Sequence, residues 1–376
     1  MKNLIVTLLS DQTIPNVQFI KEKQDDETFF LFISTQKMEN KGVQKWIMKV
    51  CNILEDRVIP MENVDEFSLD DIEAKLNKLN YSIYRNVYVN VTGGTKLMSM
   101  CVTDFFRVKN ADIYYVTGKD CWHIFPVTKR YSAPLKDNIT LKDYVESYGF
   151  EMKEGSLSEI SYKYTKSFLK EFLKFDSKDK SIINNLRTYN PEKKKNYRTR
   201  DKGCSIDAVA GMSELLYEIN FSITFGQKKL SHKEVRYLTG DWFEEYIYYR
   251  LKQELSISED NIKTGIILSK NNIPNEFDII FLWNGSLYII ECKTSIINKA
   301  AEDMNILNET IYKATAIQKN LGLYSKFFIF TLSSKESGDV KETHLERGKL
   351  FNIDVFGRED IVNCQNIAEL LKLNPC

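Results

Sequence analysis

The sequence has few of the side chains that build zinc sites or disulfide frameworks. Its 376 residues include only three histidines and seven cysteines, and no two cysteines form a CxxC pair. These counts argue against a zinc module and against a fold stapled by disulfides. They fit reduced thiols in a cytoplasmic protein.

The sequence also lacks a net charge and a long apolar run. Lys+Arg and Asp+Glu both number 52, so only local patches could attract an anionic partner. The first apolar run covers only residues 4–9, which is short for a signal peptide and far short of a membrane span. We therefore expect a cytoplasmic protein that has no membrane partner.

The first 148 residues alternate between strand and helix patterns. Continuous apolar runs predict buried strands at 4–9, 29–35, 86–92 and 112–116. This alternation predicts a Rossmann-like α/β domain, in which helices wrap a parallel sheet. Ligands of such sheets bind beyond the carboxyl ends of the strands. The expected helices after the second strand cover 36–54, 68–79 and 97–106.

The rest of the chain divides into a helical connector, 149–230, and a second α/β domain, 231–376. The second domain begins with a helix at 237–251, and three meandering strands should give it a mixed sheet. The expected strands are 262–269, 276–283, 286–293, 326–332 and 353–356, and the later helices are about 303–321, 339–350 and 359–372.

The connector contains a basic stretch. Residues 161–202 carry 13 Lys/Arg against 5 Asp/Glu, with tyrosines and phenylalanines between them. One interpretation is a solvated helical connector that ends in an exposed loop at 190–203. The other is a contact with nucleic acid through counterion release.

Two consecutive glycines lie where the strand at 86–92 gives way to a helix, in "NVTGGTKLMS". Gly93 and Gly94 allow a ligand to approach the backbone closely, and the helix N-terminus offers free N–H groups. Thr92, Thr95 and Lys96 add hydroxyls and an ammonium, so the inventory suits a phosphate. The segment matches neither the P-loop nor the GxGxxG pattern. The alternative is a tight turn before a capped helix.

The first strand ends in another polar turn, "SDQTIPN" at 10–16. In a doubly wound sheet the first and fourth strands are often neighbours, so this turn and the Gly-Gly loop could line one crevice. Neither loop supplies a histidine, a cysteine or a pair of carboxylates. This favours binding over catalysis here.

A second group of polar residues lies on "NEFDIIFLWNGSLYIIECK", residues 275–293. Asn-Gly between two apolar runs predicts a two-residue hairpin turn. The resulting register places Asp278 opposite Glu291, with Cβ atoms about 5 Å apart, and Glu276 opposite Lys293. Cys292 should point to the other face and lie in the core.

Two carboxylates this close repel each other unless a cation lies between them or one of them takes a proton. Their hard oxygens favour Mg²⁺ or Mn²⁺. Lys293 shares a face with Glu291 and could position a water and stabilise charge on a phosphoryl group. The alternative is a strand pair whose ends simply reach solvent.

The helix at 237–251 offers a third carboxylate. Glu244 and Glu245 lie on an otherwise aromatic helix, and either could complete a metal site. We favour Glu244, which lies four residues after Gly240. The alternative is a solvated polar edge of the helix.

Four segments of the chain resemble known families. "NEFDII…YIIECKT" and "GDWFEEYIYY" resemble the PD-(D/E)xK, restriction-endonuclease-like nucleases, although Phe277 stands where the family name has proline. "SDQTIPNVQFI" and "NVTGGTKLMS" resemble the CARF domain, a Rossmann-like sensor of cyclic oligoadenylates. In this order, the segments resemble the ancillary nucleases of type III CRISPR antiviral defence.

The resemblance implies a homodimer with one cyclic oligoadenylate, expected to be cyclic tetra-adenylate, on its two-fold axis. It also implies single-stranded RNA or DNA as substrate and Mg²⁺ or Mn²⁺ as cofactor. The residues it implies for metal binding are Glu244, Asp278 and Glu291, with Lys293 as a further catalytic residue. The implied ligand contacts are Ser10, Gln12, Thr13, Thr35, Thr92, Gly93, Gly94, Thr95 and Lys96.

Two other functions remain open at this point. The protein could be a nucleotide-sensing regulator that holds nucleic acid without cleaving it. It could also be a restriction-type endonuclease that works without an activating ligand.

Overall fold

The computed structural model describes most of the chain. The described ranges are 2–118, 120–136, 139–153, 155, 165–166, 168–169, 177–189, 204–221, 228–296, 306–323 and 325–373. In these ranges no helix has the length and apolar character needed to cross a membrane. The six described cysteines form no disulfides.

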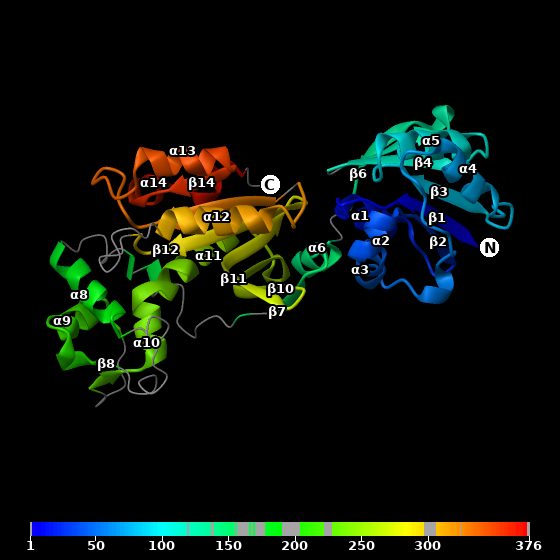
Figure 1. Ribbon diagram of the computed structural model, residues 1–376. Helices are drawn as coiled ribbons and strands as arrows, with labels where there is room; N and C mark the ends of the chain where they lie inside the picture. Colours follow the sequence, from blue (N-terminus) through cyan, green and yellow to red (C-terminus); the bar gives the residue numbers. More distant parts are fainter. Residues whose placement is uncertain are drawn as a thin grey trace.

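The first domain is built on a six-stranded sheet with the order β2-β1-β3-β4-β5-β6. The first four strands in this order are parallel, and β5 and β6 add an antiparallel edge that the sequence pattern missed. Helices α1 and α3 pack on one face, and α4 and α5 on the other (Figure 1). The predicted Rossmann-like fold is confirmed. The strands are β1 Asn3–Leu8, β2 Thr28–Ile33, β3 Asn86–Asn90, β4 Asp112–Thr117, β5 Asp120–Phe125 and β6 Tyr131–Pro134.

Local sequence signals set the helix boundaries in this domain. The Ser68 and Thr95 side chains accept backbone N–H groups and begin α4 and α5. Gly42, at φ +81°, divides the helix predicted at 36–54 into two. The helices are α1 Ile14–Lys23, α2 Gln36–Lys41, α3 Val43–Val50, α4 Leu69–Asn77 and α5 Lys96–Arg107.

The strand before the two glycines is the third strand of the chain, not the fourth. This strand, β3, pairs in parallel with β1. The turn after β1 and the Gly-Gly loop after β3 therefore leave the same edge of the sheet from neighbouring strands. The expectation that the two loops adjoin is confirmed, although the strands before them are the first and the third.

The second domain contains a mixed six-stranded sheet with the order β14-β13-β12-β11-β10-β7. The pairs from β7 to β12 are antiparallel, whereas β12, β13 and β14 run parallel. The predicted mixed α/β architecture is confirmed. Its edge strand β7 comes from the segment just after the first domain and was missed. The strands are β7 Glu151–Lys153, β10 Ile262–Lys270, β11 Ile273–Trp283, β12 Ser286–Lys293, β13 Ser325–Thr331 and β14 Ile353–Phe356.

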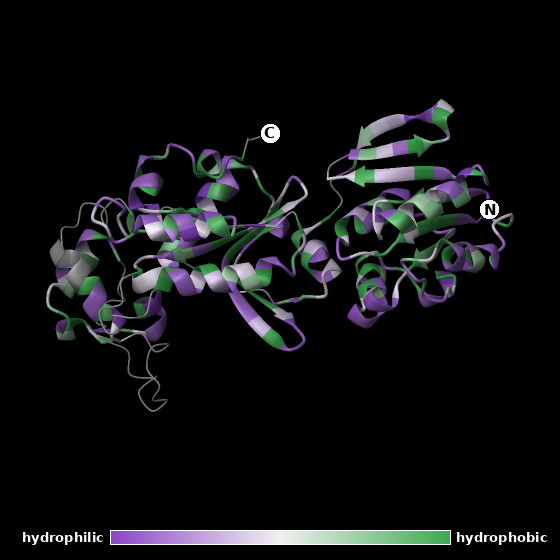
Figure 2. Ribbon diagram, turned by 45° about the horizontal axis from the view of Figure 1, so that its top comes forward, coloured by the Kyte–Doolittle hydropathy of each residue, from purple (hydrophilic) through white to green (hydrophobic). Residues whose placement is uncertain are grey.

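The second sheet is covered on both faces. Ile280 and Ile289 belong to a hydrophobic cluster on one face, and Ile279, Ile290 and Cys292 belong to a cluster on the other. The predicted burial of Cys292 in the core is thus confirmed. Figure 2 shows the apolar character of the central strands in both sheets.

A π-helical turn at Tyr237–Asp241 joins α10 to the aromatic helix α11, where a single helix was expected. The last predicted helix is likewise divided in two. The helices are α10 His232–Arg236, α11 Trp242–Glu254, α12 Ile306–Gln318, α13 Glu342–Leu350, α14 Arg358–Asn363 and α15 Ile367–Leu370.

The described parts of residues 149–230 pack on the second domain. Phe168, Leu186 and Leu216 share a hydrophobic cluster with Trp242 and Phe243 of α11. Helix α8 (Ser177–Arg187) and helix α9 (Met212–Glu218) lie in this part. The predicted loop at 190–203 and most of the basic stretch lie outside the described residues.

Helix α6 (Leu141–Ser147) lies between the two domains (Figure 1). The Thr140 side chain begins it with a capping box that includes Asp143. Its buried Tyr144 and Val145 belong to the same hydrophobic cluster as Ile14 of the first domain and Leu307 of the second. The apolar core is therefore continuous from one domain to the other.

Candidate functional sites

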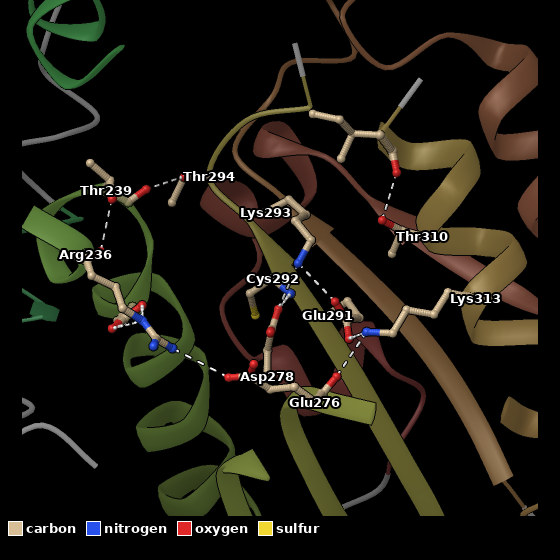
Figure 3. Close-up of polar contacts among 12 residues, drawn as sticks. Arg236, Thr239, Glu276, Asp278, Glu291, Cys292, Lys293, Thr294, Thr310 and Lys313 are labelled. Carbon is tan, nitrogen blue, oxygen red and sulfur yellow. Dashed lines mark hydrogen bonds and ion pairs between the residues drawn. The ribbon is translucent and has the colours of Figure 1, made fainter. Parts of the chain in front are cut away.

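The Lys293 ammonium lies between the two predicted carboxylates (Figure 3). Its Nζ is 3.2 Å from Asp278 Oδ2 and 3.0 Å from Glu291 Oε2. Glu291 is buried, so the ion pairs form in a largely dry environment. The structure thus brings together the three residues that the hairpin register was expected to gather.

The hairpin has the predicted register, but its ladder ends early. The Asn284-Gly285 turn pairs Trp283 with Ser286, and the pairing continues to Ile279 and Ile290. Beyond them, the Asp278 carboxylate accepts the N–H of Cys292 at 2.7 Å. The side chain takes the place of a ladder contact, so the strands separate where the charged residues begin.

The predicted direct pairings of Asp278 with Glu291 and of Glu276 with Lys293 do not form, because the β11–β12 ladder ends at Ile279 and Ile290. Glu276 pairs with Ile267 of β10, and its carboxylate lies 3.5 Å from the Arg236 guanidinium. Lys293 pairs with Thr331 of β13 and turns its ammonium toward Asp278 and Glu291. A regular ladder would have placed Lys293 opposite Glu276, two residues beyond Asp278.

The electrostatics of the cluster reflect both burial and like charge. Burial raises the pKa of Glu291, and the neighbouring Asp278 raises it further. Burial alone would lower the pKa of Lys293, but the charges of Asp278 and Glu291 outweigh it and raise that pKa. The ammonium therefore stays charged and partly neutralises the carboxylates.

Glu244 on α11 lies close enough to this cluster to feel its charges. Burial raises its pKa well above the ordinary value, and the charges of Asp278 and Asp241 add to that effect, whereas Lys293 opposes it. The neighbouring Glu245 acts electrostatically on Tyr249, further along α11. These electrostatic interactions favour Glu244 over Glu245 as the carboxylate that acts on Asp278.

The residues present fit a hard divalent ion. Asp278, Glu291 and Glu244 offer carboxylate oxygens, which such ions prefer. Glu291 Oε1 is buried and has no hydrogen-bond partner in the described part of the chain. Within the described residues, however, no three His, Cys, Asp or Glu side chains are already arranged around one metal position. The Lys293 ammonium lies between two of the three carboxylates instead.

In the first domain, the Gly-Gly loop packs directly on the end of β1. A Cβ added to Gly93 would lie 2.1 Å from the Leu8 carbonyl oxygen and 3.4 Å from Ser10 Oγ. Gly94 has φ +71°, a conformation that other residues rarely adopt. Gly93 is thus required because the loop approaches β1 closely, and Gly94 is required because the turn needs a positive φ.

The predicted threonines have local structural roles. Thr92 Oγ1 donates to Asn90 Oδ1 and accepts the Val116 N–H. Thr95 and Thr35 accept backbone N–H groups at the start of α5 and α2. Lys96 is exposed beside Thr95, and in the described part of the chain its ammonium forms no ion pair.

Gln12 and Thr13 bond to residues outside the Gly-Gly loop. Thr13 Oγ1 lies 2.9 Å from the Ser147 hydroxyl at the end of α6, and both residues are buried. Gln12 Oε1 accepts the Leu323 N–H of the second domain at 2.9 Å. The structure therefore gathers Ser10 with the Gly-Gly loop, whereas Gln12 and Thr13 lie at the junction between domains.

Comparison with protein families matches each domain separately. The Card1 CARF domain family matches residues 4–144, and the Card1-like endonuclease domain family matches residues 231–372. The chain joins a Card1-type CARF domain to a Card1-like endonuclease domain. The two carboxylates and Lys293 lie within the endonuclease domain, and the Gly-Gly loop lies within the CARF domain.

Solved structures share this architecture along nearly the whole chain. Can2 from Sulfobacillus thermosulfidooxidans, in complex with cyclic tetra-adenylate, has a TM-score of 0.70 and 22% identity over 94% of this chain and 95% of that chain. Protein VC1899 from Vibrio cholerae has a TM-score of 0.72 and 16% identity over 96% and 95%. A type III CRISPR defence DNA nuclease activated by cyclic oligoadenylate has a TM-score of 0.52 and 14% identity, over 89% of this chain and 46% of that chain. No curated protein matches the sequence.

Further cations surround the carboxylates of the endonuclease domain (Figure 3). Lys313 of α12 lies 3.7 Å from Glu291 Oε1, and Arg236 of α10 contacts Glu276 at the edge of the site. Arg187 of α8 donates to Thr294, the residue after Lys293, at 2.7 Å. Sequence reasoning did not single out Arg236 or Arg187, because nothing in their local sequence indicates which strands they reach.

Proposed function

We propose that this protein is a metal-dependent endonuclease of type III CRISPR defence that a cyclic oligoadenylate activates. One observation carries this proposal: an endonuclease domain in which Lys293 joins Asp278 and Glu291, on the same chain as a CARF domain. The proposed activator is cyclic tetra-adenylate at the axis of a homodimer. The proposed substrate is single-stranded RNA or DNA.

The chemistry follows from what each side chain can do. Asp278 and Glu291, with Glu244, would hold Mg²⁺ or Mn²⁺, which would supply a polarised phosphoryl oxygen and a more acidic bound water. Lys293 remains positively charged and can stabilise the negative charge that develops on the phosphate. Burial of Glu291 keeps bulk water from screening these interactions.

The proposed activator site is the crevice between the turn after β1 and the Gly-Gly loop. Close packing of Gly93 on Leu8 and Ser10 brings the two loops together. The exposed Lys96 and the N-terminus of α5 give this crevice the positive potential that a phosphodiester requires. The complex of Can2 with cyclic tetra-adenylate supports this choice of ligand.

A cleavage assay tests the proposal directly. Labelled single-stranded RNA and DNA are incubated with the protein, with Mg²⁺, Mn²⁺ or a chelator, and with or without cyclic oligoadenylates of several ring sizes. We expect cleavage only when both a divalent ion and an activator are present. Cleavage that needs no activator would instead support a restriction-type endonuclease.

The absence of cleavage under every condition would favour a regulator that only holds nucleic acid. Calorimetry with cyclic tetra-adenylate separates this case from an inactive preparation. A regulator binds the ligand, whereas failure to bind any cyclic oligoadenylate would contradict the assignment of the sensor site.

A further inference from the structure

Two hydrogen bonds join the CARF domain and α6 to the turn at residues 321–323 of the endonuclease domain. Tyr144 of α6 donates its hydroxyl to the Leu321 carbonyl at 3.1 Å. Gln12, in the turn after β1, accepts the Leu323 N–H at 2.9 Å. Leu321 is buried, and Leu323 is exposed. The first and third residues of the 321–323 turn are thus held by the CARF domain and α6.

The middle residue of this turn leaves no room for a side chain. A Cβ added to Gly322 would lie 2.0 Å from the Tyr148 hydroxyl oxygen and 3.1 Å from Gln12 Oε1. Gly322 also has φ +81°, which disfavours any other residue. The turn therefore fits closely against Tyr148 and Gln12.

On the sensor side, the contact is continuous with the proposed activator site. Ser10 Oγ accepts the Gln12 N–H at 3.2 Å, and Ser10 also lies beside Gly93. Thr13, next in sequence, is fixed to Ser147 of α6. A ligand that moves the turn after β1 would therefore act on the Leu323 N–H through Gln12.

On the nuclease side, the same helix reaches the carboxylates. Lys313 lies on α12, five residues before the helix ends at Gln318, a span of about 7.5 Å along the helix. Its ammonium is 3.7 Å from Glu291 Oε1 and donates to the Glu276 carbonyl at 3.1 Å. The buried face of α12, with Ile311 and Ala314, is part of the core shared by both domains.

We propose that α12 couples the two sites. In this view the turn after β1 sets the position of the 321–323 turn. Helix α12 transmits that position to Lys313, which orients Glu291. Lys313 is a positioning residue, because it acts on the reaction through Glu291. This inference rests on the proposed function, since it assigns the regulation of the same nuclease site.

The first test removes the hydroxyl that holds Leu321. Tyr144→Phe should lower the ratio of cleavage rates with and without saturating activator by about 3- to 10-fold. The matched control is Tyr81→Phe, because the Tyr81 hydroxyl also donates to a backbone carbonyl, that of Leu76, at 3.0 Å, but within the CARF domain. An unchanged ratio in Tyr144→Phe would overturn the proposal. Tyr148→Phe is a second variant at the same turn, should Tyr144→Phe fail to fold.

A double-mutant cycle tests the route through Lys313. Lys313→Gln should lower the activated rate, and in that background Tyr144→Phe should have almost no further effect on the ratio. Lys313→Arg should restore much of the rate. Lys326→Gln is the matched control, because both lysines lie 5.8 Å from an aromatic ring centroid. Fully additive effects of the two changes would contradict a shared route.

Amide hydrogen exchange provides a readout that does not depend on nuclease activity. Tyr144→Phe should speed exchange in the 321–323 turn and also along α12 to the turn that bears Lys313, whereas Tyr81→Phe should change neither. Faster exchange confined to the turn would overturn the coupling. If cyclic oligoadenylates fail to bind, the proposed function fails, but this measurement still decides whether α12 and the turn move together.

Discussion

The two candidate sites of this protein are built in opposite ways. In the CARF domain, polar residues gather on loops after parallel strands, and most of their hydroxyls already bond the backbone. In the endonuclease domain, the charged groups lie on paired strands, and Glu291 is buried against Lys293. The loop site depends on backbone shape, whereas the strand site depends on charge. Substitutions that change backbone shape should therefore affect mainly the loop site, and substitutions that remove charge should affect mainly the strand site.

The largest effect should come from removing charge in the strand site. Glu291→Gln keeps the shape of the side chain but removes a carboxylate, so cleavage should fall by about 10³-fold. Binding of the activator, measured by calorimetry, should be unchanged. The control is Glu276→Gln on the same hairpin, which keeps the carbonyl that Lys313 contacts. Wild-type cleavage by Glu291→Gln would rule out this site.

A change of shape should be the most damaging substitution in the loop site. In Gly93→Ala the new methyl group would clash with the Leu8 carbonyl, at a cost of about 1–3 kcal/mol. We expect activator binding to weaken by about 10-fold or more and the melting temperature to fall by about 3–10 °C. Gly240→Ala is the control, because its Cβ would meet open space and its φ is not positive. Unchanged binding by Gly93→Ala would show that the two loops do not form one site.

A change of charge in the loop site should have a smaller effect. Lys96→Gln removes one ammonium from an exposed position, so activator affinity should fall by about 10-fold. Because α5 still begins at Thr95, the rate at saturating activator should equal that of the wild type. Lys78→Gln, on the surface near α4, should leave the affinity unchanged. Full activation of Lys96→Gln at low activator concentration would argue against a phosphate contact at this residue.

The smallest effect concerns stability in the strand site. The raised pKa of Glu244 means that the folded state binds this proton more tightly than the unfolded state. Stability should therefore decrease as the pH rises through the ordinary glutamate pKa toward the raised value. Without divalent ions, Glu244→Gln should raise the melting temperature by about 1–3 °C at about pH 8 and have little effect near pH 4.5. A lower melting temperature at both pH values would indicate a structural role instead.

The sequence predicted the strand site well because a two-residue turn fixes every pair that follows it. Asn284 and Gly285 both adopt positive φ, and counting from them correctly paired the strands up to Ile279 and Ile290. The count failed from Asp278 onward, because the Asp278 carboxylate accepts the Cys292 N–H and the ladder ends there. Counting residue pairs from the turn assumes that no side chain takes a backbone N–H group that the ladder would use.

The loop site was harder to predict because hydroxyl groups have local alternatives. The pattern correctly placed Thr92 and Thr95 between a strand and a helix, but the same residues cap helices and close turns. Gln12 could not be assigned from its neighbours in sequence, because its partner Leu323 lies 311 residues away. Contacts between domains leave no periodic signal in either segment.

Strand β7 has a practical consequence for dividing the protein. Residues Glu151–Lys153 cover the outer edge of β10 by pairing with Ile267, Leu268 and Ser269. A fragment that begins at residue 231, where the endonuclease match starts, would leave that edge of β10 open. Open edges recruit strands from other molecules, so this fragment should aggregate more readily than one that begins just before β7.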